Sequence, residues 1–214
     1  YSAQEVGKKF EIPVNKITVV SEGVEHILRV REDNSILTKF NLAKDSYLLV
    51  VGGTQNKNFD LILDLVDKYK NDIPTVVVAG AIDKEIKPKI LGQEKIKLVG
   101  RISDEELVAL YKNAECFIFP SLIEGFGIPP LEAMKLGCPV ICADATSLPE
   151  VCGDAALYCN PYDSSSLLDV INRVTDDPEL RKMLIQRGLK RANMYSWNQV
   201  AEKILNRLVE VFKE

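Results

Sequence analysis

The chain has 214 residues, of which 46% are hydrophobic, and its formal net charge is −4 from 27 basic and 31 acidic residues. This hydrophobic content supports a sizeable core in one large domain or in a domain with an appendage. The acidic balance, without a long basic cluster, argues against nucleic acid or an anionic membrane as the main partner. No apolar run approaches the roughly 20 residues of a membrane helix, and the N-terminus lacks a signal-peptide core. We therefore expect a cytoplasmic protein.

Residues 1–45 differ in character from the rest of the chain. They combine a short helical pattern, a predicted strand in KITVV (residues 16–20) and the polar stretch REDNS (residues 31–35). This arrangement indicates the tail of a preceding lobe followed by a linker.

In residues 46–195, short apolar runs alternate with amphipathic stretches. Each run is apolar at consecutive positions, as strands covered on both faces require. The alternation predicts a doubly wound, Rossmann-like α/β domain with a parallel six-stranded sheet, and ligands bind such sheets at the carboxyl ends of the strands. The predicted strands are residues 47–53, 75–80, 96–100, 116–120, 139–143 and 155–159.

Capping residues mark several helix starts. Ser103 opens a predicted capping box, and Asp163 is a candidate N-cap. Two prolines predict a helix over residues 129–136. In residues 196–214 apolar side chains recur at helical spacing, so we expect an amphipathic helix with Trp197 in a core.

The cysteine and histidine content disfavours several kinds of site. The five cysteines lie inside or beside apolar runs without a C-x-x-C pair, and His26 is the only histidine. This pattern is typical of reduced, buried thiols in a cytosolic protein, and it predicts no zinc site. His26 also lies far along the chain from every predicted strand-end turn, which disfavours a Ser-His-Asp or Cys-His hydrolase.

The stretch EGFGIPPLE (residues 124–132) follows the fourth predicted strand and opens a helix. The first turn of that helix presents unpaired N–H groups and a positive dipole end, which suit a phosphate. Gly125 and Gly127 let backbone amides approach a ligand, while Glu124 and Glu132 can accept hydroxyl hydrogen bonds. This combination describes a nucleotide-sugar site. The structural alternative is that Glu124 caps its own loop and Glu132, expected in the first turn, complements the helix dipole.

The sequence around this stretch resembles a known family. FPSLIEGFGIPPLEAMKLGCPVICADATSLPEVCGDAALY (residues 119–158) is similar to the signature region of retaining glycosyltransferases of group 1, family 4-like, with the GT-B fold. The similarity extends more weakly to VGRISDEELVALYKNA before it and YSWNQVAEKIL after it. The resemblance implies that the chain is the carboxyl-terminal, donor-binding lobe of a two-lobed enzyme. Its final helix is then expected to pack back toward the N-terminal lobe.

The resemblance assigns roles to individual residues. It implies catalytic roles for Glu124, which would lie by the transferred sugar, and for Lys57, which would contact the donor diphosphate. Glu132 would hold the ribose hydroxyls. The family's usual arginine near the lysine is missing, because positions 53–56 are Gly, Thr, Gln and Asn. The further donor-binding residues implied are Gly53, Arg101, Ile102, Gly125, Phe126, Gly127 and Ile128.

The implied activity is transfer of a hexose with retention from a UDP- or GDP-sugar to a saccharide or lipid-linked acceptor in surface polysaccharide synthesis. The resemblance implies no metal and no bound cofactor, and any membrane association would be peripheral, at the inner face, through the N-terminal lobe. The isolated chain is expected to be inactive.

The alternatives to a glycosyltransferase are a non-catalytic nucleotide-sugar-binding module and a GT-B sugar-nucleotide epimerase. The absence of D-x-D, P-loop and G-x-G-x-x-G motifs disfavours metal-dependent GT-A transferases, P-loop NTPases and dinucleotide enzymes.

Overall fold

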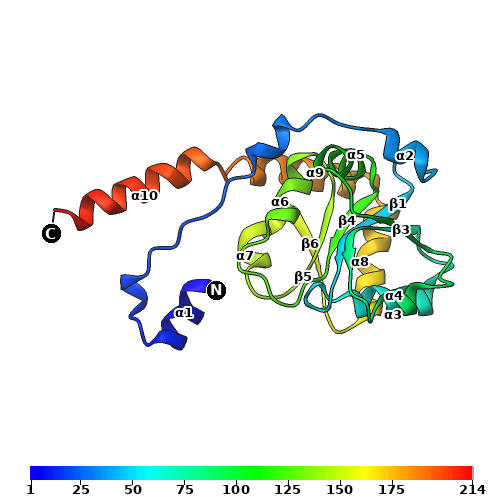
Figure 1. The fold of residues 1–214 in the computed structure, drawn as a ribbon, viewed down its shortest axis with the longest axis horizontal. Helices are drawn as coiled ribbons and strands as arrows, with labels where there is room; N and C mark the ends of the chain where they lie inside the picture. Colours follow the sequence, from blue (N-terminus) through cyan, green and yellow to red (C-terminus); the bar gives the residue numbers. More distant parts are fainter. Residues whose placement is uncertain (214) are drawn as a thin grey trace.

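The structure is a computed structural model that describes residues 1–213, with the backbone alone at Gln55. Six parallel strands form one sheet in the order β3-β2-β1-β4-β5-β6 (Figure 1). The predicted fold class is confirmed, and each predicted strand matches an observed one to within two residues. The strands are β1 (Tyr47–Gly53), β2 (Thr75–Ile82), β3 (Ile96–Gly100), β4 (Cys116–Phe119), β5 (Val140–Ala143) and β6 (Ala156–Cys159).

Helices cover both faces of the sheet. Side chains of β1 alternate between two core clusters, because successive residues of a strand point to opposite faces. Leu49 packs in the cluster that contains the apolar residues of α6, whereas Leu48 packs in the cluster that contains those of α3. The elements between and after the strands are η3 (Gln55–Lys57), α3 (Phe59–Tyr69), α4 (Lys87–Ile90), α5 (Asp104–Asn113), α6 (Ile128–Lys135), α7 (Leu148–Cys152), η4 (Gly153–Ala155), α8 (Ser164–Asp176) and α9 (Pro178–Ala192).

The first 45 residues contain no strand, so the strand predicted in residues 16–20 is wrong. Residues 17–20 pair with no other strand, and Val19 is 51% exposed. An apolar run of this length cannot form a strand without a partner that accepts its backbone hydrogen bonds. The elements here are α1 (Ser2–Phe10), η1 (Val14–Lys16), η2 (Glu25–Arg29) and α2 (Ser35–Lys39).

The C-terminal helix α10 (Trp197–Val211) projects away from the sheet domain (Figure 1). Its predicted amphipathic pattern is present, but Val200 is its only buried residue. Trp197 is 44% exposed, so its expected place in a core is wrong for the described chain. The spacing of apolar residues identified the helix correctly, yet spacing does not say whether the apolar face is covered. Packing of this helix against a preceding lobe and the boundaries of the predicted domains stay predictions.

Two predicted helix caps are confirmed. The Ser103 hydroxyl accepts a hydrogen bond from the Glu106 N–H (3.3 Å), and the Glu106 carboxylate accepts one from the Ser103 N–H (2.9 Å). At α8, the Asp163 carboxylate accepts a hydrogen bond from the Ser165 N–H. These side chains satisfy helix-start N–H groups that have no partner within the helix.

Replacing Ser103 tests how much the capping box of α5 stabilises the domain. We expect Ser103→Ala to lower the free energy of unfolding by about 1 kcal/mol, because a helix-start N–H loses its acceptor. Ser103→Thr keeps the hydroxyl and should retain most of the stability. Urea unfolding monitored by circular dichroism measures both variants. Equal midpoints for Ser103→Ala and the unsubstituted chain would show that the cap does not contribute.

Candidate functional site

The candidate site lies where the strand order reverses. β1 and β4 are parallel neighbours, with Leu49 opposite Phe117. Since α3 follows β1 on one face and α6 follows β4 on the other, the two connecting loops leave the sheet in opposite directions, which is the arrangement that forms ligand crevices in open α/β sheets. One loop carries Lys57 and the other carries Glu124.

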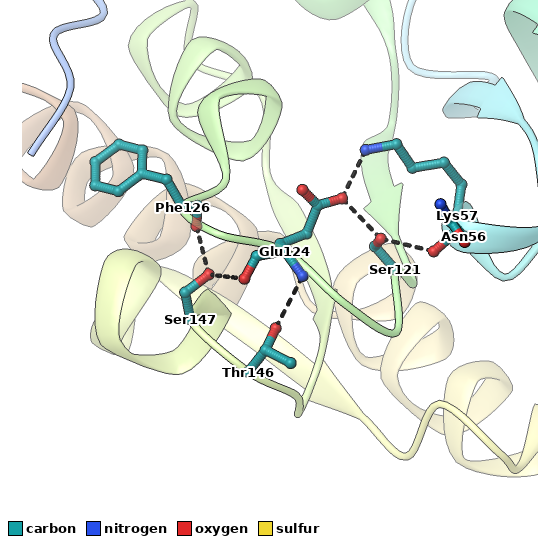
Figure 2. Close-up of polar contacts among 7 residues, drawn as sticks. All are labelled: Asn56, Lys57, Ser121, Glu124, Phe126, Thr146 and Ser147. Carbon is teal, nitrogen blue, oxygen red and sulfur yellow. Dashed lines mark hydrogen bonds and ion pairs between the residues drawn. The ribbon is translucent and has the colours of Figure 1, made fainter. Parts of the chain in front are cut away.

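An ion pair joins these two loops (Figure 2). Lys57 Nζ lies 2.6 Å from Glu124 Oε1, and the two side chains are 30% and 18% exposed. The Ser121 hydroxyl lies 2.7 Å from Glu124 Oε1 and 2.9 Å from the Asn56 carbonyl oxygen, and it can donate its one proton to either acceptor. Lys57 Nζ sits 4.5 Å from the centre of the Phe119 ring, a cation–π contact. The expected catalytic pair is therefore assembled at one point, 67 residues apart in the sequence.

The loop after β4 is held by the segment before α7. The Glu124 N–H donates to Thr146 Oγ1 (3.2 Å), and the Ser147 hydroxyl lies 2.9 Å from the carbonyl oxygens of Glu124 and Phe126 (Figure 2). Thr146 has a φ of 52°, a left-handed conformation that costs a β-branched residue roughly 1–2 kcal/mol. No motif in the sequence pointed to Ser121, Thr146 or Ser147, although all three lie in the stretch that carries the family resemblance.

Backbone amides of the same loop remain available to a ligand. Within the described residues, the N–H groups of Gly125, Phe126 and Gly127 donate no hydrogen bond. Gly127 is the N-cap of α6 with a φ of 121°, a value that requires glycine. The predicted combination of a glycine turn and a helix start is present, and it presents N–H groups suited to an anion.

A cavity of about 630 Å³ adjoins this loop. Its walls include Glu124, the three loop residues that follow and Ile128, which are five of the residues predicted for the site. The N-terminal segment and α7 complete it. The other lining residues are Tyr1, Ser2, Ala3, Val19, Val20, Ser21, Glu22, Pro129, Ser147, Glu150, Val151, Tyr195 and Lys203.

Glu132 occupies a different environment from the one expected. The helix begins at Ile128, so Glu132 falls beyond its first turn, which contains no acidic residue. The expectation that it complements the helix start is therefore wrong. Its Oε1 lies 2.9 Å from His26 Nε2, and its side chain is 14% exposed.

The interpretation of His26 as remote from the site is also wrong. Its helix η2 packs against α6, which brings His26 to Glu132 across 106 residues of sequence. No local pattern signals such a contact. Burial raises the pKa of Glu132 above its usual value, and the hydrogen bond with His26 partly opposes that rise.

The raised pKa of Glu132 predicts a pH dependence of stability. A carboxyl group with a higher pKa in the folded state stabilises the fold fully below its unfolded pKa of about 4.5, and this contribution is lost as the pH rises through the folded value. We expect the unsubstituted chain to lose unfolding free energy relative to Glu132→Gln as the pH rises through this window. Urea unfolding of both proteins across that pH range measures the difference. If the unsubstituted chain instead gained unfolding free energy relative to Glu132→Gln as the pH rose, the raised pKa of Glu132 would be contradicted.

The remaining predicted residues lie beside a second, smaller pocket. Arg101 and Ile102 line a space of about 260 Å³ at the carboxyl ends of β1 to β3. Gly53 is buried near this region, and a Cβ there would lie 2.9 Å from Ile82 Cγ1, so close packing accounts for this glycine. The other lining residues are Val51, Ala79, Gly80 and Leu107.

The predicted burial of the cysteines is confirmed. All five are free and buried. Within residues 1–213, no group of three or more His, Cys, Asp or Glu side chains could hold a metal ion, and no helix is long and apolar enough to cross a membrane. The absence of a metal from the reaction stays a prediction.

The comparisons with known proteins identify the family. Residues 32–191 match the model of the glycosyl transferases group 1, so the chain belongs to that family. It is 32% identical over 228 residues to O-antigen chain mannosyltransferase B of Escherichia coli, covering 96% of this chain and 58% of that protein. It is 31% identical over 212 residues to the MMP alpha-(1->4)-mannosyltransferase of Mycolicibacterium hassiacum, covering 94% and 50% respectively.

A solved structure supports the fold independently. The crystal structure of Anabaena HepE in complex with UDP matches with a TM-score of 0.82 at 17% identity, covering 97% of this chain and 61% of that one. At this identity the match shows a shared GT-B glycosyltransferase fold. The chain spans about half the length of the curated relatives named above.

Proposed function

We propose that this chain binds a nucleoside-diphosphate sugar at the crevice between β1 and β4 and forms the donor-binding part of a hexosyltransferase. The observation that carries this proposal is the Lys57–Glu124 pair beside the unpaired amides of Gly125 to Gly127. A lysine and a set of N–H groups suit a diphosphate, and a neighbouring carboxylate suits sugar hydroxyls.

Each part of the donor has a candidate place in this arrangement. The diphosphate would contact Lys57 and the loop amides. The ribose hydroxyls would bond Glu132 in place of His26, and the base, uracil or guanine, would enter the pocket lined by Arg101 and Ile102. Mannose is the first sugar to test, because both relatives named above are described as mannosyltransferases.

The proposed reaction transfers the sugar with retention and without a metal. The bond between the anomeric carbon and the phosphate oxygen breaks, and the acceptor oxygen bonds that carbon on the same face. The acceptor proton passes to the leaving diphosphate, whose charge Lys57 and the loop amides stabilise. A saccharide or lipid-linked acceptor would approach from an N-terminal lobe that precedes this chain. Cytoplasmic location, peripheral membrane association through that lobe and lack of transfer by the isolated chain are part of the proposal.

Lys57→Ala tests the diphosphate contact. We expect GDP or UDP to bind roughly 10- to 150-fold more weakly, the range for one hydrogen bond to a charged group, with little change for guanosine or uridine. Titration calorimetry on this chain measures all four ligands. Lys68→Ala, which removes an exposed lysine from α3, is the matched control. Equal losses for nucleoside and nucleoside diphosphate would place the role of Lys57 outside phosphate binding.

Glu124→Gln separates binding from chemistry in the full-length protein. Because its proposed partner is the reacting sugar, kcat should fall at least roughly 10-fold, while GDP or UDP affinity should change much less. Glu179→Gln on the exposed start of α9 is the control. Radiolabelled sugar transfer measures kcat. An unchanged kcat in the Glu124→Gln protein would remove its catalytic role.

A non-catalytic binding module is the second candidate. The specific observation in its favour is that residues 53–56 lack the arginine usual in the family, which leaves Lys57 as the one cationic residue from that loop. Donor turnover by the full-length protein distinguishes the two candidates. Nucleotide binding without any transfer or donor hydrolysis would favour the module.

A further inference from the structure

We propose that Ser147 and Thr146 are positioning residues that turn the amides of the Glu124–Gly127 loop toward the donor diphosphate. This inference rests on the proposed function, since it concerns how the same site is held. Neither residue contacts the donor in this proposal. Both act through the backbone of the loop.

Peptide geometry links the serine to the amides. In a planar trans peptide the C=O of one residue and the N–H of the next point in opposite directions. The Ser147 hydroxyl lies 2.9 Å from both the Glu124 and the Phe126 carbonyl oxygens and can donate its one proton to either, so both carbonyls face α7 (Figure 2). The N–H groups of Gly125 and Gly127 must then point away from α7, and these are two of the unpaired amides described above.

Ser147 contacts the loop carbonyls and does not cap its own helix, α7. Ser147 is the N-cap of α7, a position where serine ordinarily accepts a hydrogen bond from its own helix. Its side chain makes no such capping bond, and the residue is only 3% exposed. A buried hydroxyl that contacts the carbonyls of a neighbouring loop, and does not cap its own helix, acts on the shape of that loop.

Thr146 provides independent support. Its backbone holds a left-handed φ of 52°, which disfavours a β-branched side chain, and its hydroxyl accepts the Glu124 N–H. Strained conformations persist where surrounding contacts hold them, often at functional sites. The Ser147 hydroxyl contacts the Glu124 carbonyl, and the Thr146 hydroxyl accepts the Glu124 N–H. Both backbone polar groups of Glu124 therefore have a partner, and its carboxylate is held near Lys57.

The first test compares Ser147→Ala with Ser164→Ala in this chain. Each variant removes one buried, hydrogen-bonded serine hydroxyl, but Ser164 lies at the start of α8 and bonds Asp64. We expect Ser147→Ala alone to weaken GDP or UDP binding roughly 3- to 10-fold without a matching change for the nucleoside. Ser147→Ala alone should also accelerate hydrogen exchange of the Glu124 amide, which is the hydrogen-bonded N–H of this loop, and this readout needs no ligand.

Thr146→Gly separates positioning from general stability. Glycine relieves the left-handed strain, so we expect a melting temperature equal to or above that of the unsubstituted chain. Diphosphate affinity should nevertheless fall, because the acceptor for the Glu124 N–H is lost. Thr146→Asn, which tolerates this φ and keeps an acceptor, should restore part of the affinity.

The outcomes distinguish this inference from the proposed function. If the unsubstituted chain binds neither GDP nor UDP, the proposed function fails and the donor role of the loop fails with it. If it binds them, and Ser147→Ala matches Ser164→Ala in both exchange and affinity, only the inference is overturned. Faster exchange with unchanged diphosphate affinity would likewise overturn it, since the loop would then be held for another reason.

Discussion

The pairing of β1 with β4 is the constraint on which the rest of the site depends. Parallel pairing brings the carboxyl ends of the two strands together, and the helices that follow them cover opposite faces of the sheet. The loop after β1, which carries Lys57, therefore lies beside the loop after β4, which carries Glu124. Lys57 and Glu124 meet there with low exposure, where their attraction is screened less than at the surface.

Both carboxylates of the EGFGIPPLE stretch are bonded to basic side chains of the same chain. Glu124 is paired with Lys57, and Glu132 with His26. A donor that bonds these groups therefore exchanges internal contacts for its own, and only the difference appears as affinity. The amides of Gly125 to Gly127 differ, because among the described residues they donate no hydrogen bond that a ligand would have to replace. This makes the backbone, rather than the charged side chains, the part of the site most ready for an anion.

The N-terminal segment and α10 extend the molecule beyond the sheet domain. The segment contributes to the cavity beside Glu124 and supplies His26, while α10 exposes an apolar face that includes Leu205 and Phe212. Contiguous apolar surface of this kind commonly marks an interaction site. The proposed N-terminal lobe would cover it and would bring the acceptor to the cavity, so the proposed donor site would be one part of a larger catalytic cleft.

The six strands, the two helix caps and the glycine turn that leads from β4 into α6 could be predicted from the sequence, because they follow from periodicity, propensity and local hydrogen bonding. Through a family resemblance, the sequence also supplied the expectation that Lys57 and Glu124 are catalytic residues. Only the tertiary structure placed His26 against Glu132 and Ser147 against the loop. It also left Trp197 exposed. Such outcomes depend on which segments pack together over long sequence separations, and no local pattern encodes that choice.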